Sequence, residues 1–108
     1  MTTEHSEQAD KTQRPVHIAH DEDAHRYTIT YEGDSSPVGY LEYVDEGSER
    51  NFKHTVVKKE YGGRGLAGVL VKVAAEDSAS RGWPIIAECP YVSSWMEKND
   101  FQGEWRTP

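Results

Sequence analysis

The chain has 108 residues, with 12 lysines and arginines against 19 aspartates and glutamates, so its formal net charge is -7. That length allows one domain with one modest core, and the negative charge argues against DNA or RNA as the main partner. The single cysteine, Cys89, excludes an internal disulfide, and no apolar run approaches the roughly 20 residues that a membrane helix needs. Residues 1–11 also lack an apolar signal core, so we expect a protein of the reducing cytoplasm without a membrane partner.

The first fifteen residues are almost wholly polar and show no periodicity. Such a segment buries too little apolar surface to offset its ordering entropy, so we predict a disordered tail over residues 1–15 and a single compact domain over 16–108. The next segment, HIAHDEDAH, reads as a loop that contains residue types zinc accepts. Its spacing matches no tight ligand motif, so we predict no metal site at His17, His20, Asp21, Asp23 and His25.

Three segments have the pattern of half-buried strands. In RYTITYE, Tyr27, Ile29 and Tyr31 alternate with two threonines, and this period of two is typical of a strand with one buried face. VGYLEYV and NFKHTVV follow, each after a turn rich in Asp, Gly or Ser. We predict that the three segments, residues 26–32, 38–44 and 51–57, pair as an antiparallel meander.

One helix and a further strand complete the predicted sheet. From Arg64 to about Arg81, apolar residues recur at helical spacing. Residues 83–89 read as a short apolar strand, which a helical crossover brings parallel to a neighbour. A short helix is predicted over residues 91–99. The predicted fold class is therefore α/β, in the α+β sense, with a mixed but mostly antiparallel sheet and one long helix.

The segment KKEYGGRGLAGVL lies between a predicted strand and the long helix, and residues 63–68 match the G-x-G-x-x-G motif of dinucleotide-binding folds. Glu88 follows at about the twenty-residue distance at which a ribose-binding acid lies. In those folds, however, the first strand leads straight into the glycines, and several βαβ units build a parallel sheet. Here charged residues intervene after Val57, and the sheet begins with hairpins, which argues against that fold.

The alternative for this loop is a diphosphate site of another kind. Main-chain amides and the helix N-terminus suit the diphosphate of coenzyme A, and glycines let the main chain approach its oxygens. Between Lys53 and Arg64 there are four cations and one anion, a positive island in an acidic chain. Taken alone, the segment fits equally well a tight turn whose lysines face water.

Longer stretches carry a family resemblance. HTVVKKEYGGRGLAGVLVKVA, followed by ECPYVSSWMEKNDF, resembles the GNAT superfamily of N-acetyltransferases, and most of all its small single-domain members with H-T-x-V, E-x-x-G-x-G-x-A and C-P-x-V motifs. The resemblance is strong from His54 to Val92 and weaker back to about Val16. It implies a GNAT-like fold, in which the strand of Cys89 splays away from the strand of His54. It also implies acetyl-CoA as cofactor, bound by Val56, Val57, Lys58, Gly62, Gly63, Arg64, Gly65, Leu66 and Ala67.

Acetyl transfer to an amine needs a base for the amine, a donor for the oxyanion and an acid for the departing thiolate. A main-chain N–H near Val56 suits the oxyanion. The larger superfamily often has a tyrosine acid in a segment resembling F-Y-E-K-x-G-F, but Met96 holds that place here. We therefore expect His54 as base and Cys89 as acid or acetylated nucleophile, facing one another on adjacent strands. A packing cysteine and a histidine without chemistry are the alternatives.

Two functions follow from these residues. The first is an acetyl-CoA-dependent N-acetyltransferase acting on an amine acceptor, either a small molecule or a protein. The second is a module that binds coenzyme A or acyl-CoA without turnover and acts through a protein partner. Met96 favours the second function, whereas His54 together with Cys89 favours the first. The residues specify neither the acceptor nor an oligomeric state.

Overall fold

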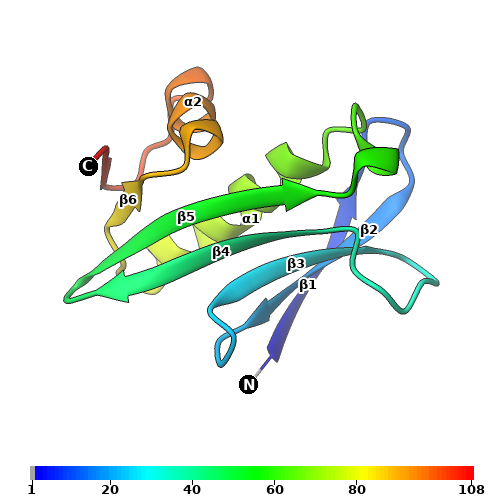
Figure 1. The fold of residues 1–108 in the computed structure, drawn as a ribbon, viewed down its shortest axis with the longest axis horizontal. Helices are drawn as coiled ribbons and strands as arrows, with labels where there is room; N and C mark the ends of the chain where they lie inside the picture. Colours follow the sequence, from blue (N-terminus) through cyan, green and yellow to red (C-terminus); the bar gives the residue numbers. More distant parts are fainter. Residues whose placement is uncertain (1) are drawn as a thin grey trace.

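The structure, a computed structural model, describes the main chain of residues 2–108 and the side chains of residues 8–108, so Met1 lies outside the described residues. Over residues 2–108 the chain forms one seven-stranded sheet and two α-helices (Figure 1). The strands are ordered as in the chain, antiparallel from β1 to β5 and parallel from β5 to β7. The elements are β1 (Thr2–Ala9), β2 (Pro15–Asp21), β3 (Arg26–Tyr31), β4 (Gly39–Glu46), β5 (Glu49–Val57), the 3-10 turn η1 (Lys59–Tyr61), α1 (Leu66–Ser80), β6 (Ile85–Ala87), α2 (Pro90–Lys98) and β7 (Trp105–Arg106).

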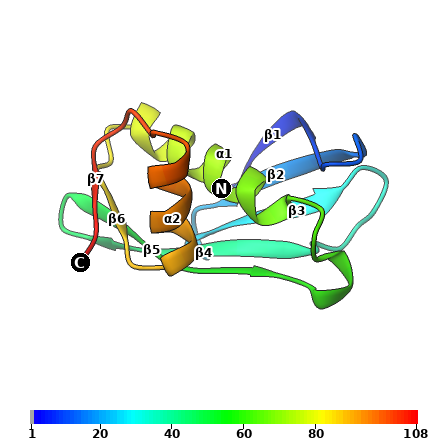
Figure 2. The ribbon, with the colours of Figure 1, turned by 90° about the horizontal axis from the view of Figure 1, so that it is seen from above.

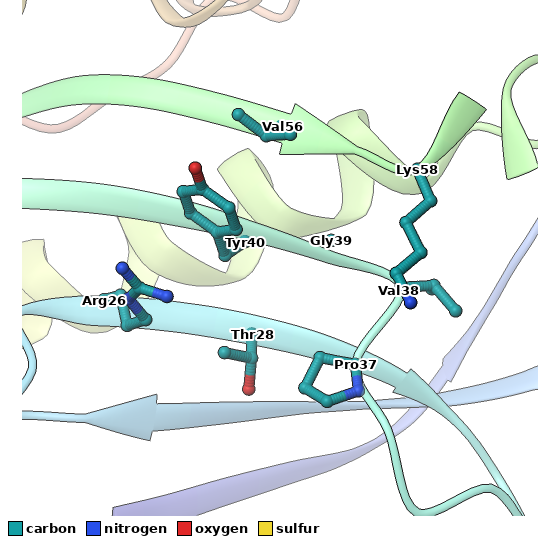
Figure 3. A pocket seen from close by; sticks show the side chains of 8 residues that line it. All are labelled: Arg26, Thr28, Pro37, Val38, Gly39, Tyr40, Val56 and Lys58. Carbon is teal, nitrogen blue, oxygen red and sulfur yellow. The ribbon is translucent and has the colours of Figure 1, made fainter.

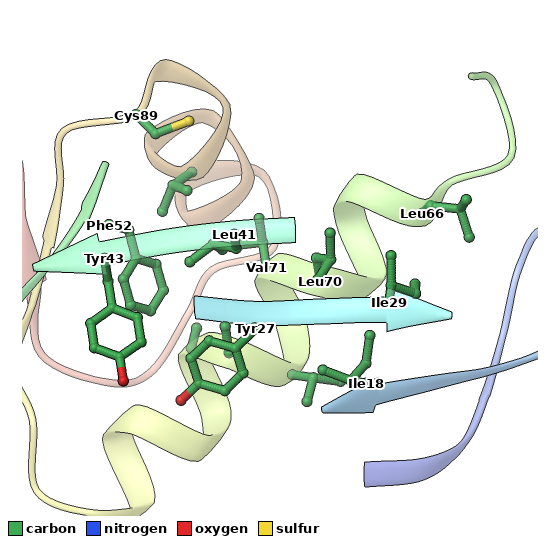
Figure 4. Packing of buried hydrophobic residues seen from close by; sticks show 14 of the residues in the cluster. Ile18, Tyr27, Ile29, Leu41, Tyr43, Phe52, Leu66, Leu70, Val71 and Cys89 are labelled. Atoms are coloured by element: carbon green, nitrogen blue, oxygen red, sulfur yellow. The ribbon is translucent and has the colours of Figure 1, made fainter. Parts of the chain in front are cut away.

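Both helices cover the same face of the sheet. Figure 2 shows α1 and α2 on one side of β4 and β5, and α1 contacts β3, β4 and β5 while α2 contacts β5 and β6. The core fills the space between this face and α1, with Tyr27, Phe52 and Leu70 among its largest fully buried side chains (Figure 4). The mixed sheet and the helical crossover from β5 to β6 confirm the predicted fold class.

The central strands and the long helix lie close to their predicted bounds. In β3 the predicted inward residues Tyr27, Ile29 and Tyr31 are all buried. The helix begins at Leu66 instead of Arg64, because Gly65 has a left-handed backbone (φ 79°) that a helix cannot contain. Within the described residues, neither helix is long and apolar enough to cross a membrane.

The predicted disordered tail over residues 1–15 is wrong for the residues that are described. β1 pairs antiparallel with β2, and a turn closes this hairpin. The carboxylate of Asp10, 3% exposed, organises the turn, because it accepts hydrogen bonds from the amides of Thr12 (2.8 Å) and Arg14 (3.0 Å) and from the Tyr31 hydroxyl (2.6 Å). The Tyr31 hydrogen bond is the main reason that the pKa of Asp10 lies well below its usual value. Main-chain pairing and one buried carboxylate order a segment that apolar burial alone would leave unfolded.

The expectation that the histidine-rich segment is a loop is wrong for residues 17–21, which belong to strand β2, whereas residues 22–25 form the turn to β3. Val16, Ile18 and His20 alternate inward and are buried. The third inward position is a histidine, so a search for alternating apolar residues does not recognise this strand. Within the part of the chain that is described, no three His, Cys, Asp or Glu side chains gather as metal ligands.

His20 belongs to a buried polar cluster between the sheet and the end of α1. Its ring stacks on Tyr27 with centroids 4.1 Å apart, and its Nε2 forms a 2.6 Å hydrogen bond with the Tyr43 hydroxyl. Its Nδ1 lies 3.4 Å from Oδ2 of Asp77, which also accepts a 2.7 Å hydrogen bond from the Tyr27 hydroxyl. Burial lowers the pKa of His20, and the negative charge of Asp77 only partly opposes that shift.

We expect the free energy of unfolding to decrease as the pH falls below about 6.5, the ordinary pKa of histidine. Since the folded-state pKa of His20 is lowered, the unfolded chain binds this proton more readily. The stability that neutral His20 contributes is therefore complete above the unfolded pKa and is lost as the pH falls towards the folded one, by at most about 1.4 kcal/mol per pH unit. Urea unfolding between pH 8 and pH 5 measures this loss. In His20→Gln, the free energy of unfolding should depend less on pH over this range. An equal pH dependence in the wild type and in His20→Gln would contradict the role of His20.

Candidate functional site

An opening in the sheet lies between the second half of β5 and the start of α2. β6 pairs with β5 only from Arg50 to Phe52, and the amide of Cys89 makes a last hydrogen bond, 3.0 Å long, to the Phe52 carbonyl. Pro90 then begins α2, which turns the chain away from the sheet. Beyond Phe52, β5 continues to Val57 with no strand beside it on that edge among the described residues. This divergence is the predicted splay.

A β-bulge sets which main-chain groups of β5 face the opening. Tyr43 pairs with Phe52 but Glu42 pairs with His54, so Lys53 is an extra residue in β5. The amide of Lys58 then donates to the carbonyl of Val38, the residue just before β4, at 2.8 Å. Because hydrogen-bonding direction alternates along an antiparallel pair, His54 and Val56 also direct their main-chain groups towards β4.

The free edge therefore consists of Thr55 and Val57, whose N–H and C=O groups point into the opening. Val57 is among the residues that the family resemblance predicts to bind acetyl-CoA, and Thr55 is not. Val56 is also among them, but it directs its main-chain groups to β4 instead. The bulge causes this difference of one residue, and nothing in the pattern NFKHTVV indicates a bulge.

Cys89 lies at the vertex of the opening, at the start of α2 (Figure 4). Its side chain is 7% exposed, and its Sγ donates weakly to Oγ1 of Thr55 over 3.6 Å. His54 precedes Thr55, and successive side chains of a strand point to opposite faces, so the exposed His54 lies on the face that carries no helix. The prediction that His54 and Cys89 face one another is wrong, and the two residues instead flank β5 from opposite sides.

The helix-free face beside His54 carries a shallow, mainly apolar hollow of about 150 Å³ (Figure 3). Arg26, Tyr40, Val56 and Lys58 are among the residues that line it. Arg26 stacks 4.6 Å over the ring of Tyr40. His54 is two residues from Val56 and therefore projects from the same face. This hollow therefore lies on the same face of the sheet as His54.

Carboxylate and ammonium groups lie close to His54 on the same face. Glu88 accepts a hydrogen bond from Lys53 Nζ (3.1 Å) and another from Asn51 Nδ2 (3.1 Å). These hydrogen bonds, the one from Lys53 first, lower the pKa of Glu88, and the charge of His54 adds a smaller effect in the same direction. The helix-free face therefore carries charged groups near His54 as well as the apolar hollow, whereas Cys89, on the other side of β5, is nearly buried in the core.

The glycine loop presents unoccupied amides at the start of α1. The N–H groups of residues 63–68 donate to no acceptor within the described part of the chain, and Gly65 caps the helix without a side-chain hydrogen bond. Gly63 and Gly65 have φ values of 76° and 79°, which favour glycine. Gly62 differs, because its amide closes the 3-10 turn by donating to Lys59 at 3.1 Å. The amides of Gly63, Arg64, Gly65, Leu66 and Ala67 are thus available to an anion, and that of Gly62 is not.

Other predicted residues have positions that only the structure reveals. The guanidinium of Arg64 lies 5.1 Å over the ring of Tyr61 and donates to the Tyr31 hydroxyl at 3.4 Å, so it turns away from the free amides. Met96 is 1% exposed and packs in the core. Sequence reasoning missed Lys11, whose amide donates to the Arg64 carbonyl at 2.9 Å. No local motif marks it, because a hairpin far away in the chain brings it to the loop.

Comparison with known proteins gives three results. The family model described as GCN5-related N-acetyltransferase matches residues 26–105. A solution structure of a GCN5-like protein from Staphylococcus aureus, one assigned as an N-acetyltransferase, is similar with a TM-score of 0.61 and 27% identity, over 78% of this chain and 83% of that one. No curated protein matches the sequence.

Proposed function

Because the chain belongs to the GCN5-related N-acetyltransferase family, we propose that it transfers the acetyl group of acetyl-CoA to an amine acceptor. The observation that carries this proposal is the free edge of β5 next to the free amides at the start of α1. An amide-containing arm fits the edge at Thr55 and Val57 as an added strand. A diphosphate fits the amides of residues 63–68, where the helix dipole favours negative charge. The two features adjoin, since β5 leads into the loop through η1.

In the proposed reaction the residues on the two sides of β5 have separate tasks. The acceptor amine approaches from the helix-free face, and His54 takes the proton that the amine loses as it bonds to the acetyl carbon. On the other side, Cys89 gives its proton to the thiolate that leaves when the carbon–sulfur bond breaks. In the covalent variant, Cys89 itself first displaces that thiolate and carries the acetyl group to the amine. Either route uses Cys89 as a free thiol, which a reducing cytoplasm maintains.

Release of free thiol tests the proposed function. We expect the protein to release coenzyme A from acetyl-CoA only when an amine is present, and mass spectrometry should find the acetyl group on that amine. The panel should include a diamine, a lysine-containing peptide and a peptide with a free N-terminus, because the opening faces solvent on the His54 side. Binding of acetyl-CoA without release of thiol for any amine would contradict transfer.

The second candidate function is a coenzyme A-binding module without turnover. Met96 is the observation that favours it, because this side chain is buried in the core and has no proton to donate to a thiolate. Such a module would use the same edge of β5 and the same amides, and it would act through a protein partner. The thiol-release experiment separates the two functions, since only the transferase consumes acetyl-CoA.

A further inference from the structure

The hairpin of β1 and β2 lies outside the matched residues 26–105 but touches the loop that leads into α1. Figure 1 shows the turn of this hairpin beside that loop, and the amide of Lys11 in the turn donates to the carbonyl of Arg64 at 2.9 Å. We propose that the ammonium group of Lys11 is the cation that binds the coenzyme phosphates. From its place in the glycine loop, Arg64 would be expected to do this. This inference rests on the proposed function and adds a residue to its site.

Contacts with the hairpin hold the Arg64 side chain away from the proposed phosphate site. Asp10 accepts a 2.6 Å hydrogen bond from Tyr31, and the Tyr31 hydroxyl accepts one of 3.4 Å from Arg64. The Arg64 guanidinium also lies over the rings of Tyr31 and Tyr61, at 5.8 and 5.1 Å. Arg14, from the same turn, covers Tyr31 at 4.2 Å. These contacts hold the Arg64 side chain against the aromatic rings.

The same turn then places Lys11 at the start of the helix. Carbons Cγ, Cε and Cδ of Lys11 lie 3.0, 3.3 and 3.5 Å from the point where a Cβ on Gly65 would be. The side chain is exposed, and among the side chains that are described no carboxylate lies within 4.0 Å of its ammonium group. A cation next to the positive end of a helix is electrostatically unfavourable unless an anion joins them. The free amides and Lys11 together make a site for such an anion.

A hollow of about 370 Å³ extends from this point between the hairpin, α1 and α2. Lys11, Gly65, Lys72 and Trp95 are among the residues that line it. The space lets the phosphates of a nucleotide reach Lys11 while the diphosphate stays on the amides. Lys72 offers a second positive charge in this lining, and the carboxylate of Asp10, which also lines the hollow, is taken up by its hydrogen bonds to Thr12, Arg14 and Tyr31, so the hollow suits a polyanionic ligand.

The test compares Lys11→Met with Arg106→Met by calorimetric titration with coenzyme A at low salt. Both changes remove one positive charge, but Arg106 pairs with Glu49 (2.9 Å) at the opposite end of β5. Methionine keeps an apolar stem against Gly65, so the comparison isolates the charge. We expect Lys11→Met to raise the Kd for coenzyme A about tenfold, as the loss of one charged phosphate contact does. Lys11→Arg should restore tight binding, and the difference should shrink at high salt.

Two other kinds of result would refute the role of Lys11. If wild-type protein and Lys11→Met bind coenzyme A equally well, or if Arg106→Met weakens binding as much as Lys11→Met does, the role of Lys11 is refuted. If the wild-type protein itself does not bind coenzyme A, the proposed function fails and the role of Lys11 fails with it. Thermal unfolding of each variant confirms that the compared proteins are folded.

Discussion

Cys89→Ala should lower the rate of acetyl transfer by at least about 100-fold, in line with the loss of a general acid or nucleophile. Cys89 is the only thiol of the chain and lies at the vertex of the opening, with its Sγ 3.6 Å from Oγ1 of Thr55. No main-chain group of the proposed coenzyme site changes, because that site consists of the β5 edge and the amides of residues 63–68. The Kd for coenzyme A should therefore stay within about twofold.

Steady-state rates and the intact mass of the protein after exposure to acetyl-CoA measure this effect. An acetyl adduct that is present in the wild type and absent from Cys89→Ala indicates the covalent route, whereas an adduct in neither indicates direct transfer. Met96→Leu is the matched control, because it changes a buried side chain of α2 with little change in volume. Full activity in Cys89→Ala would refute the role of the thiol.

Gly65→Ala should weaken the binding of coenzyme A at least about tenfold, as expected when the geometry of a preorganised anion site is lost. Gly65 has a φ of 79°, and a Cβ there would lie 3.0 Å from Cγ of Lys11. An alanine in this left-handed conformation costs about 1–2 kcal/mol, and relief of that strain moves the amides at the start of α1. The exposed side chain of Lys11 must also shift slightly to make room for this Cβ.

The matched control for this change is Gly47→Ala, in the turn between β4 and β5. Gly47 has a similar φ of 64°, but nothing lies within 4 Å of a Cβ there. Both variants should lose similar stability to urea from backbone strain, and only Gly65→Ala should lose affinity for coenzyme A. Equal Kd values for the two variants would show that the loop amides do not bind the coenzyme.

Features with a regular local period could be predicted from the sequence. The alternation of Tyr27, Ile29 and Tyr31 gave β3, and the helical spacing of apolar residues after Arg64 gave α1, because each pattern repeats within one element. The glycine loop could also be recognised from the sequence, because its residues form one short consecutive motif. The family resemblance added the splay of β5 and β6, which no local pattern contains.

The missed features depend on contacts between distant residues. β1 is held by main-chain pairing and by Asp10, whose partner Tyr31 lies 21 residues away. The bulge at Lys53 inserts one residue into β5, and this insertion moves His54 to the face opposite Cys89. The turn of Arg64 towards Tyr31 likewise comes from a side-chain contact over 33 residues. Single-residue shifts and long-range polar contacts of this kind leave no period in the sequence.

The central claim is that the free edge of β5 and the free amides at the start of α1 together bind coenzyme A. Its most direct test follows backbone amide shifts of the wild-type protein during titration with coenzyme A, with Gly65→Ala as the comparison. We predict that the largest shifts occur at Thr55, at Val57 and over residues 63–68, that Val56 moves less, and that Gly65→Ala loses these shifts. No saturable shifts, or shifts confined to other parts of the sheet, would contradict the claim.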